Sequence, residues 1–189
     1  VPATHIRQLM DLAREAKGKM SYGSAGGGTT GHLVGELLKK RAGIALTHIP
    51  YKGSGPALSA LLSAEVPMMM SAPPAVLGMA QAGRVRVLAG SGTVRTPVLP
   101  DVPTFTEAGI PGMQDYTWTG VFLPAGTPAA IVQRHNEAIN RILQMPDIRD
   151  RLDVQALEVV GGTSAQFTDY VRAEIAKWGK VVREANVKA

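Results

Sequence analysis

The sequence predicts an α/β fold: a parallel-type sheet flanked by helices, followed by a C-terminal helical segment. Over residues 5–92, short apolar runs of strand length alternate with segments whose apolar residues recur at helical spacing. Glycine and proline separate these segments, and the connections are short, as in parallel β-α-β units. Of the 189 residues, 45% are hydrophobic and 19% charged, which is enough apolar material for a buried core.

The first half of the chain supplies the alternation. Residues 5–16 place Ile6, Leu9, Met10 and Ala13 on one face, so a helix is expected there, closed near Gly18. Glycine or proline also marks the ends of the other expected helices. The strands are expected at residues 20–22, 44–50, 66–70 and 85–90, and the helices between them at 32–42, 56–64 and 75–82.

The pattern changes after residue 92. Residues 93–112 are rich in proline and glycine, with one short helix expected at 104–108. Later in the chain, Thr127 and Pro128 resemble an N-cap and a first helical position, and Thr163 with Gln166 forms a capping-box pair. We therefore expect a strand at 116–123, a helix from 127 to 143, a short helix at 147–152, a strand at 157–160 and a last helix to about residue 185.

Composition excludes several classes of protein. Cysteine is absent, so disulfides, thiolate metal sites and cysteine nucleophiles are excluded. No apolar run approaches the roughly 20 residues that span a bilayer, and no signal-peptide pattern opens the sequence. The net charge is +5, with 11 Lys/Arg against 4 Asp/Glu in residues 1–95. That half has only two aromatic residues, Tyr22 and Tyr51, for base stacking, so we expect no nucleic-acid partner.

The glycine-rich segment 23–31, between an expected strand and an expected helix, is the most informative stretch. Glycines let the backbone approach a ligand closely, and the helix start offers free N–H groups and a positive dipole end. Capture of a small anion, phosphate or carboxylate, is therefore expected. The candidate residues that follow from this segment are Ser24, Ala25, Gly26, Gly27, Gly28, Thr29, Thr30 and His32.

Two nucleotide-binding motifs can be compared with this loop. Gly23–Thr30 has the spacing of a P-loop, but Thr29 stands where the phosphate-binding lysine belongs. Residues 26–31 match the dinucleotide pattern G-x-G-x-x-G, but the next strand ends at Pro50 without a ribose-binding acid. A dinucleotide or nucleotide ligand therefore stays an alternative, as does a tight turn without a ligand.

Other candidates lie at the same expected sheet edge. Ser71 and Ala72 follow the third strand, where open α/β sheets bind ligands at the carboxyl ends of their strands, although a plain turn is equally consistent. His32 either contacts a ligand or caps and packs locally. The other histidines show no metal-ligand spacing, and no cofactor is expected. No nucleophile–His–acid arrangement appears, and the first half of the chain holds no paired carboxylates, so binding is favoured over catalysis.

Several spaced motifs resemble one family of receptors. They are KMSYGSAGGGTTGHL at 19–33, HIPYKG at 48–53, LPDVPT at 99–104 with EAG at 107–109, PAGTP at 124–128 and WGKVV at 178–182. In this order they resemble the Bordetella uptake gene (Bug) family, the extracytoplasmic solute receptors of tripartite tricarboxylate transporters. The resemblance covers the whole chain.

The resemblance implies a type II periplasmic-binding-protein fold, in which two α/β lobes joined by hinge strands close around a small carboxylate. Residues 1–115 would be the second lobe, 116–123 a hinge strand, and 124–189 a segment that returns to the first lobe. Relatives carry further sequence, including a signal peptide and a second glycine-rich loop, before the position of Val1. The implied location is the periplasm.

The resemblance also implies a non-enzymatic function. Family members pass a carboxylate solute to membrane permease subunits, and the loop matching Gly23–Thr30 binds the ligand carboxylate. Relatives often carry an Asp-Asn pair where this chain has Ser71 and Ala72, so we expect a carboxylate without a cationic group. A nucleotide-dependent enzyme domain and the ligand-sensing domain of a regulator remain the alternatives from other classes.

Overall fold

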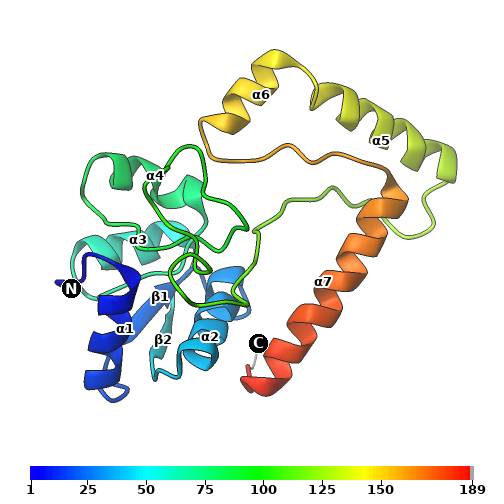
Figure 1. The fold of residues 1–189 in the computed structure, drawn as a ribbon. Helices are drawn as coiled ribbons and strands as arrows, with labels where there is room; N and C mark the ends of the chain where they lie inside the picture. Colours follow the sequence, from blue (N-terminus) through cyan, green and yellow to red (C-terminus); the bar gives the residue numbers. More distant parts are fainter. Residues whose placement is uncertain (188–189) are drawn as a thin grey trace. The chain divides into compact units, whose positions relative to one another are not determined.

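The computed structural model describes residues 1–187, and they divide into two compact units. The first comprises Val1–Thr117 with the residues from Val181 onward, and the second Trp118–Lys180 (Figure 1). In chain order the elements of the described residues are α1 (Ile6–Glu15), β1 (Ser21–Ser24), α2 (Thr30–Ala42), β2 (Thr47–Pro50), α3 (Ser54–Leu62), α4 (Pro73–Gln81), α5 (Ala129–Ile142), α6 (Pro146–Asp153) and α7 (Ser164–Glu184).

The sheet of the first unit is parallel, as the sequence predicts. β1 pairs with β2 in the register Tyr22 to His48. On its other side β1 makes a single parallel bridge, from Gly23 to Met69: the Gly23 N–H donates to the Met68 carbonyl at 2.9 Å, and the Met70 N–H donates to the Gly23 carbonyl at 3.0 Å. The third expected strand is therefore present only as this bridge, and β1 lies between its two neighbours.

The other expected strands are corrected by the structure. Residues 85–90 form no strand, only a bridge between Gly90 and Thr104, and residues 116–123 and 157–160 form none. Val121, Phe122 and Val160 are exposed. A β-branched and aromatic sequence forms a strand only where a neighbour pairs its backbone, and beyond the Gly90 bridge no neighbour within the described residues pairs these segments.

The helix expected at residues 104–108 is a single turn. Its start is well capped, because the Thr104 N–H donates to the Glu107 carboxylate at 2.8 Å and the Glu107 N–H donates to Thr104 Oγ1 at 3.1 Å. Gly109, with φ of 85°, and Pro111 follow at once. A left-handed residue and a proline prevent the next turn, so the cap opens no helix.

Helix α2 packs closely on the sheet through its glycines. A Cβ at Gly35 would lie 2.3 Å from the ring of Tyr22, and one at Gly31 would lie 2.7 Å from the Met70 carbonyl oxygen. The Tyr22 side chain is fully buried, and Leu33, Leu37 and Leu38 of α2 are buried as well. Because Gly31 and Gly35 are four residues apart, they lie on one helix face and let α2 lie directly against β1.

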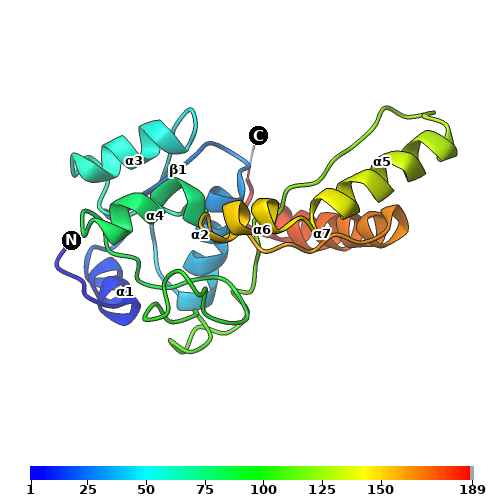
Figure 2. The same cartoon turned by 90° about the horizontal axis from the view of Figure 1, so that it is seen from above.

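Helices α3 and α4 lie side by side in both views (Figures 1 and 2). Helix α3 also contacts β1, and α2 contacts both strands. The buried apolar residues of the first unit include contributions from α1, from α2 and from Phe105, Ile110 and Met113 of the proline-rich segment. The core of this unit therefore lies around the β1–β2 pair.

The second unit contains α5, α6 and most of α7, and none of the residues of these helices is fully buried. The predicted capping box opens α7: the Thr163 N–H donates to Gln166 Oε1 at 2.8 Å, and the Gln166 N–H donates to Thr163 Oγ1 at 3.2 Å. The predicted Thr127 cap is wrong, because Pro128 is the N-cap of α5 and the Thr127 hydroxyl donates to the Pro124 carbonyl at 2.7 Å. No helix of residues 1–187 is long and apolar enough to cross a membrane.

Candidate functional site

Three helices begin where the parallel strands end. α2 starts six residues after Ser24, the last residue of β1, α3 starts at Ser54 shortly after β2, and α4 starts at Pro73 after the Met69 bridge. The first turns of these helices hold no acidic residue, and their N-caps make no side-chain cap hydrogen bond. Free amide groups of α2 and α3 and three positive dipole ends therefore lie at one sheet edge, an arrangement that suits an anion. Helix α4 begins with Pro73 and Pro74, which have no N–H, so it contributes its dipole end alone.

The loop from Ser24 to Thr30 has a conformation that only glycine adopts easily. Gly26 has φ of 145° and Gly28 φ of 71°. Ser24 Oγ accepts the Gly26 N–H at 3.2 Å, and Thr29 Oγ1 donates to the Gly26 carbonyl at 2.8 Å. The hydroxyls of Ser24 and Thr29 therefore hold the loop to itself, and Ser24 is fully buried.

Other polar groups of the loop remain open. Within residues 1–187, no hydrogen bond engages the amide N–H of Gly27, Thr30 or Gly31, and none engages the Thr30 hydroxyl. A Cβ at Gly27 would have nothing within 4 Å, so the loop is open to solvent there. Ala25 is tied to the next loop, because its carbonyl accepts the Gly53 N–H at 3.0 Å.

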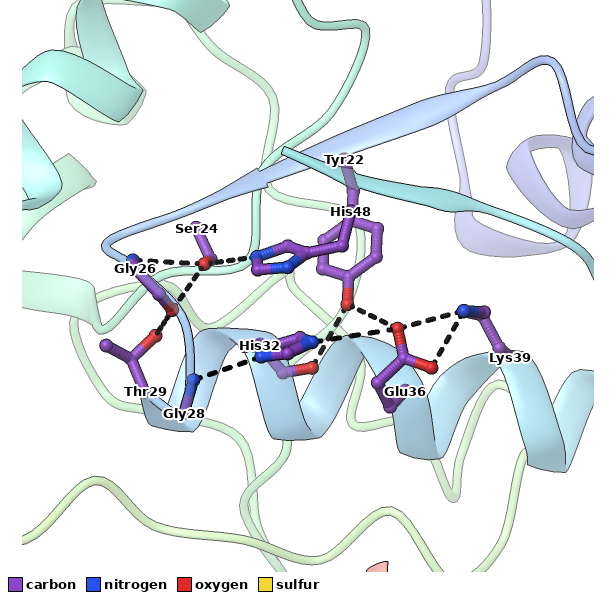
Figure 3. A network of polar contacts seen from close by, with 9 residues as sticks. All are labelled: Tyr22, Ser24, Gly26, Gly28, Thr29, His32, Glu36, Lys39 and His48. Atoms are coloured by element: carbon purple, nitrogen blue, oxygen red, sulfur yellow. Dashed lines mark hydrogen bonds and ion pairs between the residues drawn. The ribbon is translucent and has the colours of Figure 1, made fainter. Parts of the chain in front are cut away.

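Two histidine rings lie beside the loop and contact it (Figure 3). His32 of α2 and His48 of β2 are stacked with ring centroids 3.8 Å apart and an interplanar angle of 10°. His32 Nδ1 accepts the Gly28 N–H at 3.1 Å, and His48 Nε2 lies 2.6 Å from Ser24 Oγ. Of the two roles the sequence left open for His32, local capping and packing is what this geometry shows.

A second layer of polar groups fixes these rings. The Tyr22 hydroxyl lies 3.1 Å from the His32 carbonyl oxygen and 3.0 Å from Glu36 Oε1, and its proton serves both acceptors. The Glu36 carboxylate also accepts from Lys39 Nζ at 2.7 Å. Burial and the neighbouring Glu36 raise the pKa of Tyr22, so its hydroxyl stays protonated and acts as a donor.

Both imidazoles are neutral at neutral pH. Burial, followed by the charge on the neighbouring His32, lowers the pKa of His48 to about 4. The pKa of His32 is also lowered by burial, with Glu36 acting in the opposite direction. Because His32 Nδ1 accepts a hydrogen bond, the proton of its neutral ring is on Nε2, which faces Glu36 Oε1 at 4.0 Å.

The remaining predicted residues lie at the rim of this edge. Ser71 is exposed, and Ala72 is the N-cap of α4. Gly31, near the start of α2, closely approaches the Met70 carbonyl, so the adjacent Ser71 and Ala72 also lie beside the start of α2. His48 and Gly35 are the residues that the sequence analysis missed. The available signal for His48 was its place as a histidine in an apolar strand. The signal for Gly35 was its place as a glycine inside a helix.

The site does not have the chemistry of a metal centre or of a serine nucleophile. Within residues 1–187, no group of three His, Cys, Asp or Glu residues could hold a metal ion. Ser24 and His48 are in contact, but the fully buried Ser24 hydroxyl cannot reach a substrate. A separate hollow of about 720 Å³ on the second unit has Glu137 in its lining, which repels anions.

The fold is of the periplasmic-binding-protein class. The family model described as "Tripartite tricarboxylate transporter family receptor" matches residues 1–187. The chain belongs to this family.

Curated relatives agree with this assignment. A UPF0065 protein encoded between tcbD and tcbE in Pseudomonas sp. (strain P51) is 40% identical over 97% of this chain and 55% of its own length. Protein BugT of Bordetella pertussis is 35% identical over 95% of this chain and 55% of its own length. The resemblance to Bug proteins is confirmed, and the chain spans about half the length of these relatives.

Solved structures share the fold. The structure of R. palustris Rpa4515 with adipate has a TM-score of 0.92 and 35% identity, covering 99% of this chain and 62% of that one. MatC from Rhodopseudomonas palustris with bound malate has a TM-score of 0.80 and 29% identity, covering 96% and 63%. A further neighbour, at a TM-score of 0.92 and 32% identity, is a periplasmic transporter. The predicted fold class is confirmed.

Proposed function

We propose that this chain is the carboxylate-binding lobe of a periplasmic receptor for a tripartite tricarboxylate transporter. The observation that carries the proposal is the sheet edge where three helices without N-terminal side-chain caps begin beside the glycine loop. A carboxylate there would accept from the open N–H groups of Gly27, Thr30 and Gly31 and from the Thr30 hydroxyl.

The remaining site residues act around these donors. The loop is shaped by the hydrogen bonds of Ser24, Gly26 and Thr29. His32 accepts the Gly28 N–H. The rim at the start of α4 is formed by Ser71 and Ala72. No acidic side chain lies at these positions, so an ammonium group on the ligand would find no carboxylate partner among them. The solute class is a mono- or dicarboxylate without a cationic group, and adipate and malate, bound in the neighbours, belong to it.

The wider role follows from the family. Residues 1–115 would form one lobe, 116–123 a hinge segment, and 124–189 the segment that returns to the other lobe. The receptor would hand its solute to membrane permease subunits and would not transform it. Family membership and the burial of Ser24 support a receptor over an enzyme.

An NMR amide titration tests this function. The labelled chain is titrated with adipate, malate, NAD and ATP. We expect shifts at residues 24–31 with the dicarboxylates only, at affinities no tighter than about millimolar, or roughly 4 kcal/mol, because one lobe supplies only part of the contacts. Shifts with NAD or ATP alone would contradict the proposal and favour the nucleotide alternative.

A variant pair localises the site. Gly27→Val should abolish the dicarboxylate shifts without unfolding the chain, since Gly27 has open space around its Cβ position. Gly78→Val in α4 is the matched control, because Gly78 also has open space but lies away from the helix start. Equal dicarboxylate binding by Gly27→Val and Gly78→Val would contradict the assignment of the loop as the ligand-binding site.

A further inference from the structure

We propose that the His32–His48 stack is the positioning device of the carboxylate-binding loop: neutral His32 holds the Gly28 N–H, and a proton on Nδ1 releases the loop and weakens carboxylate binding. This inference rests on the proposed function for its ligand. The coupling between the ring and the loop is a property of the ligand-free protein and can be measured separately.

The glycine loop has high intrinsic conformational freedom. Residues 26–28 are three successive glycines, and Gly26 and Gly28 adopt positive φ. Glycine loses more conformational entropy on ordering than any other residue, so an unrestrained loop would have a large ordering penalty on binding. A hydrogen bond that orders the loop beforehand lowers this penalty and raises affinity.

His32 contacts the middle of the glycine run. Its Nδ1 accepts the Gly28 N–H at 3.1 Å, in the middle of the glycine run, while the Ser24 and Thr29 hydroxyls hold Gly26. The amide N–H of Gly27, between these tethers, makes no hydrogen bond within the described part of the chain. His32 therefore restrains the residue next to a ligand-binding amide without itself being the donor.

A proton on His32 Nδ1 would remove the hydrogen bond to Gly28. An N–H on Nδ1 would face the Gly28 N–H, and two donors at 3.1 Å cannot form a hydrogen bond. His48 stacks on His32 at 3.8 Å, so a charge on one ring opposes a charge on the other. Burial and then the charge on His32 lower the pKa of His48, so His48 stays neutral while His32 takes up a proton, and its stacked ring holds the His32 ring in place.

Other ionisable groups face the stack from two elements. Tyr22 on β1 lies with its ring centroid 4.9 Å from that of His48, and Glu36 and Lys39 lie on α2. Glu36 favours protonation of both rings, whereas Lys39 opposes it. Burial, the largest effect on each ring, also opposes protonation. The stack is thus neutral at neutral pH and takes up a proton on acidification.

The test begins with the ligand-free chain. Two-bond ¹H–¹⁵N spectra of the imidazoles and amide spectra are recorded from about pH 7.5 to about pH 5. At the upper pH we expect His32 with its proton on Nε2. On acidification we expect the Gly28 and Gly27 amide signals to move together with the His32 ring, with one shared midpoint. Loop signals that stay fixed while the ring titrates would overturn the proposal.

Two substitutions separate positioning from packing. His32→Leu removes the acceptor, and adipate affinity should fall by about tenfold at neutral pH. His32→Asn places an oxygen acceptor near the Nδ1 position and cannot take up a proton there. It should recover part of the lost affinity and lose the pH response of the loop. If His32→Asn is as weak as His32→Leu, the role of His32 is packing alone.

Adipate has carboxyl groups of its own that titrate in acid. The affinity ratio between wild type and His32→Asn at each pH removes this contribution, and the ratio should decrease as the pH falls. His135→Asn is the control, because His135 is an exposed histidine on α5, and its loss should leave binding and pH response unchanged. If wild type binds neither adipate nor malate, the proposed function fails, whereas the ligand-free titration still decides the coupling.

Discussion

The ring of Tyr22 occupies the space that a side chain at Gly35 would need, with its Cε2 atom 2.3 Å from the position of a Cβ. Gly35→Ala should therefore destabilise the first unit by about 2 kcal/mol, because Tyr22 is fully buried and cannot move aside. Urea unfolding measured by circular dichroism checks this. The same change at Gly78, in open space within α4, should raise stability by up to about 1 kcal/mol through helix propensity.

The stability changes expected for Gly35→Ala and Gly78→Ala have opposite signs, so comparing the two variants gives a clear test. Both substitutions replace a glycine inside a helix with alanine, so the difference between them reports only on the space around each position. A Gly35→Ala protein as stable as Gly78→Ala would contradict the close packing of α2 on β1.

The Tyr22 hydroxyl should contribute more than the Tyr51 hydroxyl. Each contacts a glutamate, Tyr22 to Glu36 at 3.0 Å and Tyr51 to Glu65 at 2.7 Å, but Tyr22 is fully buried and Tyr51 is not. Tyr22→Phe should lower the free energy of unfolding by about 1–2 kcal/mol because it leaves buried acceptors without their donor. Tyr51→Phe should change it by less than about 0.5 kcal/mol. Equal effects in urea titrations would argue against the buried network.

Stability should fall on acidification in a defined window. The pKa of His48 is about 4 in the folded chain against an ordinary value of 6.5, so the unfolded chain binds the extra proton between these values. The stabilising contribution is complete above about pH 6.5 and is lost as the pH falls toward about 4. Urea midpoints across this range should decrease with acid, and His48→Gln should flatten the profile. If the urea midpoint of His48→Gln falls with pH as steeply as that of the wild type, the loss of stability in acid comes from groups other than His48.

The capping box of α7 should matter in the second unit. Thr163→Ala removes the hydroxyl that accepts the Gln166 N–H, and the free energy of unfolding should fall by about 1 kcal/mol. Thr168→Ala, one turn further into the helix, is the matched control, because its hydroxyl donates only to the Ser164 carbonyl. Thermal unfolding followed at 222 nm compares the two. A larger loss in Thr168→Ala would contradict the cap.

The helices were predictable because their signals are local. Apolar spacing, the Thr163–Gln166 pair and Gly43 at the end of α2 act within a few residues, and the structure confirms each of them. The strands were less predictable. Residues 66–70 and 85–90 have strand-like sequences but form only single bridges, since a strand also depends on the backbone that pairs with it.

The sequence by itself determined the glycine loop, the helix that follows it, and the parallel order of β1 and β2, because backbone freedom and apolar periodicity are properties of neighbouring residues. Tertiary structure decided how the loop is held. Ser24 and His48 are 24 residues apart, and their contact, like the fit of Tyr22 against Gly35, arises only when β1, β2 and α2 pack together. Long-range contacts of this kind depend on shape complementarity between elements, which a single sequence does not encode in any local pattern.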